Sequence, residues 1–501
     1  MRKKTLVVAL LVFGVVTAVA VAAGFTATGP SSSQPPYVIP SKDGVATVSL
    51  LTVGDSVDGY RMVGIPDGLG AYESRPGTFT VLMNHELAYP EGIVRDHGAA
   101  GAFVSRFVVE DNFKVASGRD HITRVATWNP ALSTYNAPAK GVPLSRLCSG
   151  DLAARSAFYH SRSRTGYKPP LFLSGEEVGT EGRAFAHAEG GISWELPSLG
   201  KFSWENAVAN PSTGLKTVVV GTDDSTPGQV YVYVGEKQAT GNPAERAGLA
   251  GGKLYGIKVP NVPEEPKETG IASGTTFTAA DLGDVSNKTG VELEAASDDA
   301  KVTEWQRPED ASWDPQHPND LYFVITRNFG GNSKLYRLRF NDPANPAAGG
   351  KVDQLLVGTE DGGTGERFHM LDNITVDTRG HVMLQEDPGN QLYIARIWQY
   401  DIRSDSLTEV AKFDPAFVTP GSPGFITQDE ESSGIIDAEE VLGRGWYLLD
   451  AQLHKDSTDP ELVEPGQLLA LFVGSKGSVF GGGGDEDEDE DEDDDDGGDE
   501  G

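Results

Sequence analysis

One pattern recurs along this chain: a short run of β-branched and aromatic residues ends in acids, asparagine or histidine, and a second strand-like run often follows after a turn. The pattern occurs six times, at residues 78–82, 170–173, 217–220, 321–325, 381–384 and 446–449. Runs of this length, bounded by turn residues, are typical of strands. With 61 Gly, 30 Pro and few amphipathic segments, the sequence predicts an all-β protein with many short strands.

The six units are spaced irregularly, about 45 to 105 residues apart, as expected for a β-propeller with six blades and long inserted loops. In a propeller the innermost strand of each blade lines a central channel, so equivalent strand ends converge on one axis. Polar residues repeated at the same end of successive strands would then meet and form a candidate site. The alternative is that these acids are ordinary turn residues that cap strands.

The N-terminus has the pattern of an export signal. Arg2, Lys3 and Lys4 precede an apolar run at residues 5–23, and small residues near its end offer a cleavage point. The run is close to the minimum length that spans a bilayer, so its retention as an anchor stays open. We predict a secreted, periplasmic or cell-surface protein. The predicted division is a signal peptide at 1–23, a linker at 24–44, a propeller domain at 45–475 and a disordered Gly/acidic tail at 476–501.

The net charge of the chain is −33, and much of it lies in the acidic tail. Such a chain does not favour nucleic-acid phosphates or anionic lipid, so cations are its natural partners, and membrane contact is expected only if the leader is retained. Cys148 is the only cysteine, so stability must come from the core, from bound metal, or from both. We expect a monomer, because a closed propeller leaves few open strand edges.

Several motifs place possible metal ligands close together after strand runs. Carboxylates, amides and carbonyls are the oxygen ligands that Ca²⁺ prefers, and the densest set lies in the loop at residues 385–390. The candidate ligands of this kind are Asn84, Glu86, Glu177, Asp224, Asp372, Asn373, Glu386 and Asp387.

Two further positions are candidates for chemistry. Arg307 and Glu309 stand on a Pro-containing turn; they are either a surface ion pair of little energetic weight or a guanidinium aimed at an anionic substrate beside a metal ligand. Cys148 is either a small buried hydrophobe or a thiolate ligand that metal protects from oxidation. No serine-nucleophile elbow, His-Glu-x-x-His helix or phosphate-binding Gly-rich loop with Lys is present in the sequence.

An ordered set of motifs resembles a known family. The motifs are Pro66-Asp67-Gly68-Leu69-Gly70, Asn84-His85-Glu86, Cys148, Gly175-Glu176-Glu177, Asp223-Asp224, Arg307-Pro308-Glu309 and Asp372-Asn373. In this order they resemble the PhoX-type alkaline phosphatase family, in particular its secreted, largely uncharacterised branch. The resemblance runs over most of the mature chain.

The resemblance implies a propeller with a central cluster of calcium and ferric ions (Ca²⁺ and Fe³⁺) that hydrolyses small-molecule phosphate esters outside the cytoplasm. It implies Cys148, Glu177 and Glu309 as iron ligands and Arg307 as the phosphate-binding cation. Asn84, Glu86, Asp372 and Asn373 are similar to calcium-site or channel positions. Metal ions would clamp the phosphoryl group, so the implied mechanism needs no side-chain nucleophile.

The chain departs from the family pattern at Gln229, where the family has a ligand Glu, and at Trp204-Glu205, where it has a His-Glu pair. A neutral amide is a poor ligand for a ferric ion. An exported metal-dependent phosphoesterase, with or without iron, is our leading hypothesis. The alternatives are a non-catalytic calcium-binding propeller at the cell surface and a calcium-dependent, lactonase-like hydrolase.

Overall fold

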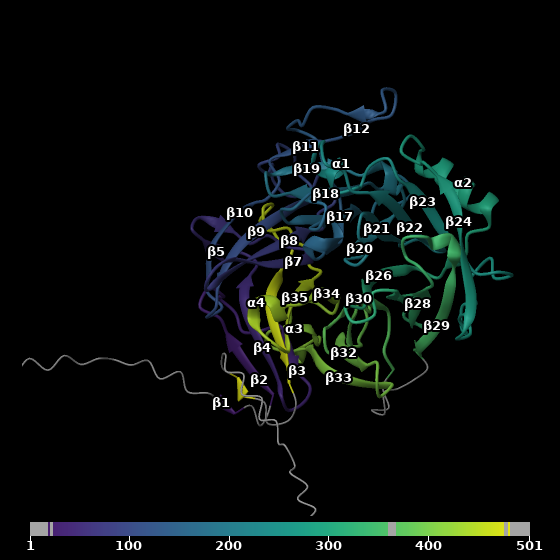
Figure 1. Ribbon diagram of the computed structural model, residues 1–501. Coiled ribbons are helices and arrows are strands. Elements are labelled where there is room, and N and C mark those ends of the chain that lie inside the picture. Colours follow the sequence, from purple (N-terminus) through teal and green to yellow (C-terminus); the bar gives the residue numbers. More distant parts are fainter. Residues whose placement is uncertain (1–18, 21–23, 359–366, 475–478, 481–501) are drawn as a thin grey trace, which may run out of the picture.

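The computed structural model describes residues 19–20, 24–358, 367–474 and 479–480, and strands dominate them. The strands form sheets arranged around a common centre (Figure 1). The predicted all-β, propeller-like fold is confirmed. Most of the predicted signal peptide and acidic tail lie outside the described residues. Within those residues, no helix has both the length and the apolar character needed to cross a membrane.

Six strands form the innermost layer of the molecule. They are β7 (Pro66–Arg75), β14 (Leu147–Asp151), β20 (Trp204–Ala209), β26 (Pro308–Trp313), β30 (Leu371–Val376) and β34 (Glu430–Asp437). Each strand contacts the next in this order, and β34 contacts β7, so the ring is closed. We call the sheets built outward from these strands units one to six, in chain order.

The second strand of each unit pairs antiparallel with the innermost one. These strands are β8 (Thr78–His85), β17 (Leu171–Glu176), β21 (Lys216–Asp223), β27 (Asp320–Ile325), β31 (His381–Glu386) and β35 (Trp446–Leu453). They contain the six predicted strand runs. The runs therefore mark the second layer of each unit rather than the strands that line the axis, because second-layer strands are packed on both faces and need β-branched and apolar residues.

Further strands complete the sheets outward. They are β9 (Phe103–Glu110) and β10 (Val115–Asp120) in unit one; β18 (Ala184–Ala188), β19 (Ile192–Glu195) and β11 (Arg124–Ala126) in unit two; β22 (Gly228–Glu236), β23 (Lys253–Lys258) and β24 (Thr275–Gly283) in unit three; β28 (Lys334–Phe340) and β29 (Gly350–Val357) in unit four; and β32 (Arg396–Asp401) and β33 (Ser406–Phe413) in unit five. Strand β24 also pairs with β29, which joins units three and four into one ten-stranded sheet. The six innermost strands are nevertheless consistent with six blades.

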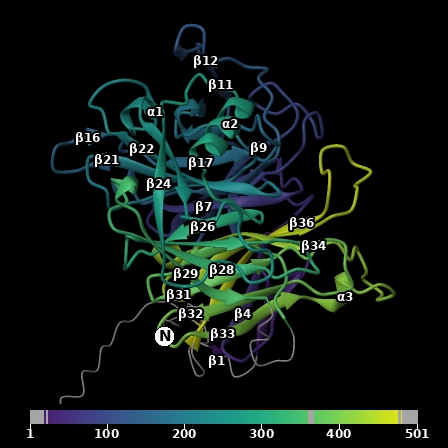
Figure 2. The same cartoon turned by 90° about the vertical axis from the view of Figure 1, so that its right-hand side faces the viewer.

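Both ends of the described chain contribute to unit six. Strand β4 (Val45–Thr52) pairs with β36 (Gly466–Val473), which pairs with β35. In Figures 1 and 2 the purple N-terminal strands accordingly lie beside the yellow C-terminal ones. Two strands fall in the segment predicted as a linker: β2 (Phe25–Thr28) pairs with β4, and β3 (Val38–Pro40) pairs with β33. This segment therefore extends two sheets at their edges, which differs from the linker prediction.

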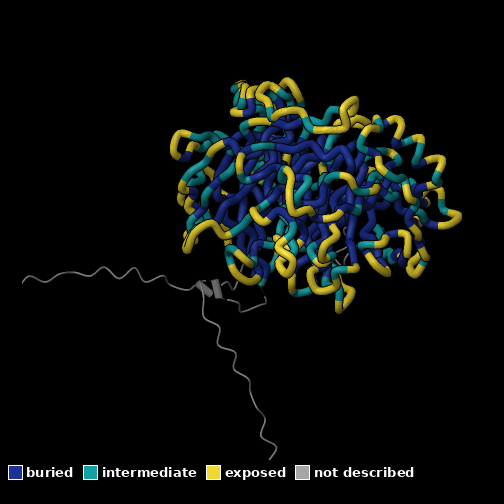
Figure 3. Tube along the Cα trace, turned by 45° about the horizontal axis from the view of Figure 1, so that its top comes forward, coloured by how far each residue is buried: buried dark blue, intermediate teal, exposed yellow. Residues whose placement is uncertain are grey.

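Helices and short strand pairs occupy the connections. The helices are α1 (Pro243–Arg246), α2 (Gly290–Ala300), α3 (Pro415–Val418) and α4 (Glu439–Leu442). The short strands are β1 (Val19–Ala20), β5 (Ser56–Val57), β6 (Tyr60–Arg61), β12 (Trp128–Asn129), β13 (Thr134–Tyr135), β15 (Tyr159–His160), β16 (Thr165–Gly166), β25 (Glu304–Trp305) and β37 (Val479–Phe480). Buried residues fill the interior between the sheets, and exposed ones gather in the connecting loops (Figure 3).

The innermost strands of units one and two approach each other closely at Gly68. A Cβ atom at this position would lie 2.3 Å from the Gly150 nitrogen and 2.5 Å from the Ser149 carbonyl carbon. Backbone atoms cannot rotate away, so we expect Gly68→Ala to lower the free energy of unfolding by about 2–3 kcal/mol. Denaturant unfolding measures this change. Gly190→Ala is the control, because a Cβ there meets nothing within 4 Å; equal destabilisation by both variants would contradict the close approach.

Candidate metal centre

Each innermost strand carries one functional side chain near its start. In all six units, the residue before this side chain pairs with the last residue of the second strand, so the six positions are structurally equivalent. The six residues, which we call the inner ring, are Asp67, Cys148, Glu205, Glu309, Asp372 and Glu431. All are buried except Glu431, whose side chain is 12% exposed.

A β-bulge explains how these side chains reach the axis. In units one to five, the pairing register between the first and second strands shifts at the inner-ring residue itself. In unit six the shift comes slightly later, after Ser433. A bulge breaks the ladder and re-aims side chains. The residues that follow in the first five units are small or polar, for example Gly68, Ser149 and Asn206. Repetition of this bulge therefore points one ligand group per unit toward a common centre.

A second set of polar groups comes from the chain just beyond the second strands. One residue directly follows the end of each second strand. We call these six residues the outer ring: Glu86, Glu177, Asp224, Thr326, Asp387 and His454. Because paired strands run in opposite directions, the end of each second strand lies beside the start of an innermost strand. The two rings therefore lie at the same end of the axis.

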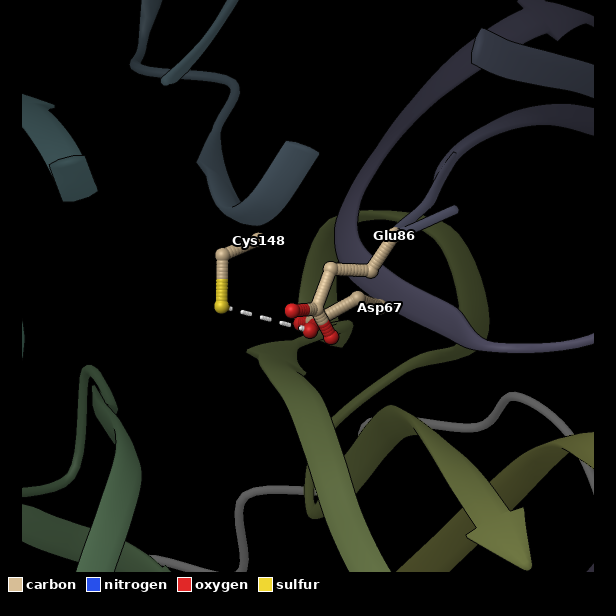
Figure 4. Close-up of side chains that lie close together, drawn as sticks. All are labelled: Asp67, Glu86 and Cys148. Atoms are coloured by element: carbon tan, nitrogen blue, oxygen red, sulfur yellow. Dashed lines mark hydrogen bonds between the residues drawn. The ribbon is translucent and has the colours of Figure 1, made fainter. Parts of the chain in front are cut away.

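Ligand atoms of the two rings lie within 4.8 Å of one another in three groups: Asp67 with Glu86 and Cys148, Cys148 with Glu177 and Glu205, and Glu205 with Glu309 and Asp372. Cys148 and Glu205 are each shared by two groups, which makes the array continuous. Figure 4 shows the first group, in which the Cys148 Sγ lies 3.5 Å from Asp67 Oδ2.

Burial and mutual repulsion raise the pKa values of these groups. Burial, followed by the charge of Glu86, raises the pKa of Asp67 well above its usual range. Burial, followed by neighbouring carboxylates, does the same to the pKa values of Glu309 and Asp372. Burial also raises the pKa of Glu205 to about 8 and the pKa of the Cys148 thiol. Protons or cations must therefore offset this buried charge, and carboxylate and thiolate donors at this spacing fit metal ions.

Two arginines lie at the rim of the rings. Arg307 donates from Nε and Nη2 to the two carboxylate oxygens of Asp224, both at 2.8 Å, and from Nη2 to Glu309 Oε1 at 2.7 Å. Arg146 lies 2.7 Å from Glu86 Oε1 and also pairs with the Glu177 carboxylate. Guanidinium groups can bind carboxylates or phosphates through two parallel hydrogen bonds.

The structure brings together most of the residues that the sequence singled out. Cys148, Glu86, Glu177, Glu309 and Asp372 belong to the three close groups. Through Arg307, Asp224 joins Glu309. The charge of Asp387 contributes to the raised pKa values of Asp372 and Glu431, which places it near the rings.

Three predicted metal ligands belong to neither ring: Asn84, Asn373 and Glu386. Asn84 Nδ2 donates to the Cys148 carbonyl at 2.6 Å, while its buried Oδ1 has no partner among the described atoms. Asn373 Nδ2 donates to Ser149 Oγ at 2.8 Å. The Glu386 carboxylate accepts hydrogen bonds from the backbone nitrogens of His369 (2.7 Å) and Arg396 (2.9 Å) and from the Tyr393 hydroxyl (2.9 Å). These donors satisfy Glu386 without a metal.

The sequence analysis did not select Asp67, Glu205 or Glu431 as ligands. The sequence does contain a weak signal for these three ligands: each is an acid that is followed by a small or polar residue and lies upstream of the strand run of its unit. The departure at Gln229 has a structural explanation: it lies on β22, where Nε2 donates to Glu294 Oε1 at 3.1 Å, and it is part of neither ring. Its amide therefore takes no ligand position from the inner ring, whose unit-three member is Glu205.

Comparisons with known proteins agree with this architecture. Residues 193–395 match the family described as Alkaline phosphatase PhoX, so the predicted resemblance is confirmed. The structure of Pseudomonas fluorescens PhoX in complex with vanadate, a transition state analogue, superposes with a TM-score of 0.63 at 13% identity, covering 91% of this chain and 97% of that chain. This similarity shows a shared fold.

Weaker similarities connect the chain to other solved structures. Chaetomium thermophilum Sqt1 bound to the N-terminus of the ribosomal protein L10 has a TM-score of 0.36 at 9% identity, covering 85% of this chain and 99% of that chain. A putative TolB from Agrobacterium tumefaciens has a TM-score of 0.30 at 9% identity, covering 71% and 84%. No curated protein sequence matches the chain.

Proposed function

We propose that this chain, which resembles the PhoX-type alkaline phosphatases, is an exported enzyme that hydrolyses phosphate esters at metal ions held by the inner and outer rings. The observation that carries the proposal is the double ring of mostly acidic residues, many of them buried, with arginines at its rim. A buried acidic array alone would repel a phosphate, so the two features make chemical sense together only when cations neutralise the acids.

The donor set fits both Ca²⁺ and Fe³⁺. Glu205, Glu309 and Asp372 offer only oxygen, which suits a hard cation such as Ca²⁺. Cys148 with Glu177 and Glu205 adds one thiolate, which suits an iron ion. Bound at these groups, the ions would supply Lewis-acid polarisation of the phosphoryl oxygens.

The residues of the chain perform the remaining tasks. Arg307, whose guanidinium is held by Asp224 and Glu309, binds and orients a phosphoryl oxygen at the rim. The inner-ring carboxylates would themselves be metal ligands, and their burial excludes bulk water from the ions. A mechanism of this kind requires no side-chain nucleophile, because the metal ions and the arginine would stabilise the phosphoryl charge.

The basic and apolar leader and the acidic composition support a location outside the cytoplasm. Calcium sites with moderate affinity fill there because the ion is abundant. The test of the proposal uses the purified full chain, measuring bound calcium and iron by elemental analysis and aryl phosphate hydrolysis at alkaline pH with and without added Ca²⁺. We expect bound metal and calcium-dependent turnover. Calcium binding without any turnover would instead favour the non-catalytic propeller.

A substitution at Arg307 tests the substrate contact. Arg307→Lys retains the charge but loses the fork, so we expect KM for an aryl phosphate to rise roughly tenfold to a hundredfold, the equivalent of one charge-assisted hydrogen bond. Steady-state kinetics and inhibition by inorganic phosphate measure the change. Arg337→Lys is the matched control, because Arg337 pairs with Asp353 at 2.7 Å on the outer strands of unit four. Unchanged KM in both variants would show that Arg307 is only a structural ion pair.

A further inference from the structure

Arg146 and Arg307 occupy the same position in two different units. Each directly precedes its innermost strand, and each lies two residues before an inner-ring ligand, Cys148 or Glu309. Both have a left-handed backbone, with φ of 44° and 66°. Because the same turn leads into equivalent strands, the two side chains approach the axis in the same way. The equivalent residues of the other units are Ile65, Ser203, Met370 and Asp429, so this position carries arginine only in units two and four.

The contacts of the two arginines are also alike. Arg307 commits Nε and Nη2 to Asp224 and Glu309. Arg146 commits Nε to the Glu177 carbonyl at 3.0 Å and Nη2 to the carboxylates of Glu177 and Glu86. Each arginine thus links its own unit to the preceding one. Within the described part of the chain, Nη1 has no hydrogen-bond partner in either residue.

Exposure places both guanidinium groups at the boundary between the rings and solvent. The Arg146 side chain is 43% exposed and the Arg307 side chain 25%, whereas the carboxylates they contact are between 2% and 15% exposed. A ligand that enters from solvent therefore meets the guanidinium groups before it meets the acids.

Glu205 connects the surroundings of the two arginines. Its carboxylate lies within 4.8 Å of ligand atoms of Glu177, which pairs with Arg146, and of Glu309, which pairs with Arg307. The arginines of units two and four therefore flank the ligand of unit three from opposite sides. A tetrahedral anion held above Glu205 offers several oxygens, so both arginines could contact it.

We infer that Arg146 is a second phosphoryl-binding arginine, and that it contacts the same phosphate group as Arg307 through its uncommitted Nη1. The inference rests on the proposed function. The competing interpretation is that Arg146 only ties unit one to unit two through Glu86 and Glu177. If Arg146 contacts the phosphate, its substitution changes the affinity of the protein for free phosphate and leaves the metal content intact. A purely structural role for Arg146 would not produce this combination.

The test compares full-length, metal-loaded variants by calorimetric titration with inorganic phosphate and by aryl phosphate kinetics. We expect Arg146→Met to raise both the Kd for phosphate and KM at least about tenfold, with a smaller rise in Arg146→Lys. Metal content and thermal midpoint are measured for each variant. Arg106→Met is the matched control: Arg106 on β9 of unit one donates from Nη1 to both carboxylate oxygens of Glu189 at 2.9 and 3.0 Å, and Glu189 directly follows β18 of unit two.

The outcomes separate this inference from the proposed function. If the wild type binds phosphate but has no turnover, and Arg146→Met weakens binding, the phosphate contact stands and the proposed activity fails. If turnover is present but the Kd and KM of metal-replete Arg146→Lys and Arg146→Met equal those of the wild type, the contact is refuted and the activity stands. A lower thermal midpoint with unchanged Kd would identify Arg146 as a structural tie. A wild type that does not bind phosphate overturns both.

Discussion

Glu205→Gln is expected to weaken metal binding at two of the three close groups and to lower kcat/KM for phosphate esters by at least about 10²–10³-fold, while the metal-free chain becomes more stable. Glu205 belongs to two of the three close ligand groups, so its loss weakens both. The effect on the metal-free chain has the opposite sign because burial raises the pKa of Glu205 to about 8, and glutamine removes this unfavourable charge. The Ser149 hydroxyl, which donates to Glu205 Oε1 at 2.6 Å, can donate to the amide oxygen instead.

Elemental analysis, steady-state kinetics and thermal melting with and without chelator measure these changes. Glu294→Gln is the control, since Glu294 forms a separate acidic group with Asp298 and Glu304 outside the rings. We expect this control to retain metal and activity. Equal loss in both variants would mean that general acidity, not the ring geometry, governs metal binding.

Removal of the metal ions is expected to make stability strongly dependent on pH. In the metal-free chain, burial raises the pKa of Glu205 to about 8 and that of Glu431 to about 7. An acid whose pKa is raised by folding stabilises the folded state below its unfolded pKa of about 4, and this stabilisation is lost as the pH rises through the folded pKa. The metal-free protein should therefore lose stability between about pH 4 and pH 8. One pKa unit corresponds to about 1.4 kcal/mol, so several such groups amount to roughly several kcal/mol.

Thermal melting at a series of pH values, with and without chelator, tests this expectation. Bound cations favour the ionised carboxylates, so the metal-loaded protein should lose much less stability over the same range. Returning Ca²⁺ after chelation should restore the midpoint at pH 8 more than at pH 5. Parallel melting curves for the two forms would contradict the assignment of the rings as a metal centre.

The sequence predicted the second strand of every unit because these strands carry recognisable runs. Residues 217–220 and 321–325, for example, are β-branched, apolar and aromatic, and they lie within the fully packed strands β21 and β27. The acids that follow them formed the predicted site, and Glu86, Glu177, Asp224 and Asp387 are indeed members of the outer ring. Local sequence was sufficient here because strand and ligand are adjacent.

The innermost strands could not be predicted in the same way. Strand β14 reads Leu-Cys-Ser-Gly-Asp, and β26 begins Pro-Glu-Asp, which are unfavourable compositions for a strand. The innermost strands are stabilised instead by closure of the ring and by the repeated bulge. Both depend on contacts between residues that are distant in sequence. Asp67, Glu205 and Glu431 were therefore not selected, whereas Cys148, Glu309 and Asp372 were selected from their local motifs, and the family resemblance then supported them.

The pairing of β4 with β36 determines the order in which a newly made chain can become functional. The inner ring draws on positions from Asp67 to Glu431, and β36, which pairs with the N-terminal strand β4 in unit six, ends at Val473. Contacts so distant in sequence form late, because the entropy of closing a long loop must first be overcome. A chain that is still emerging from a ribosome or a translocation pore is an open arc of sheets whose acids face water. Under the proposed function, metal capture is therefore expected to follow closure of the ring, and a chain shortened before β36 is expected to lose the pairing that joins the two ends of unit six.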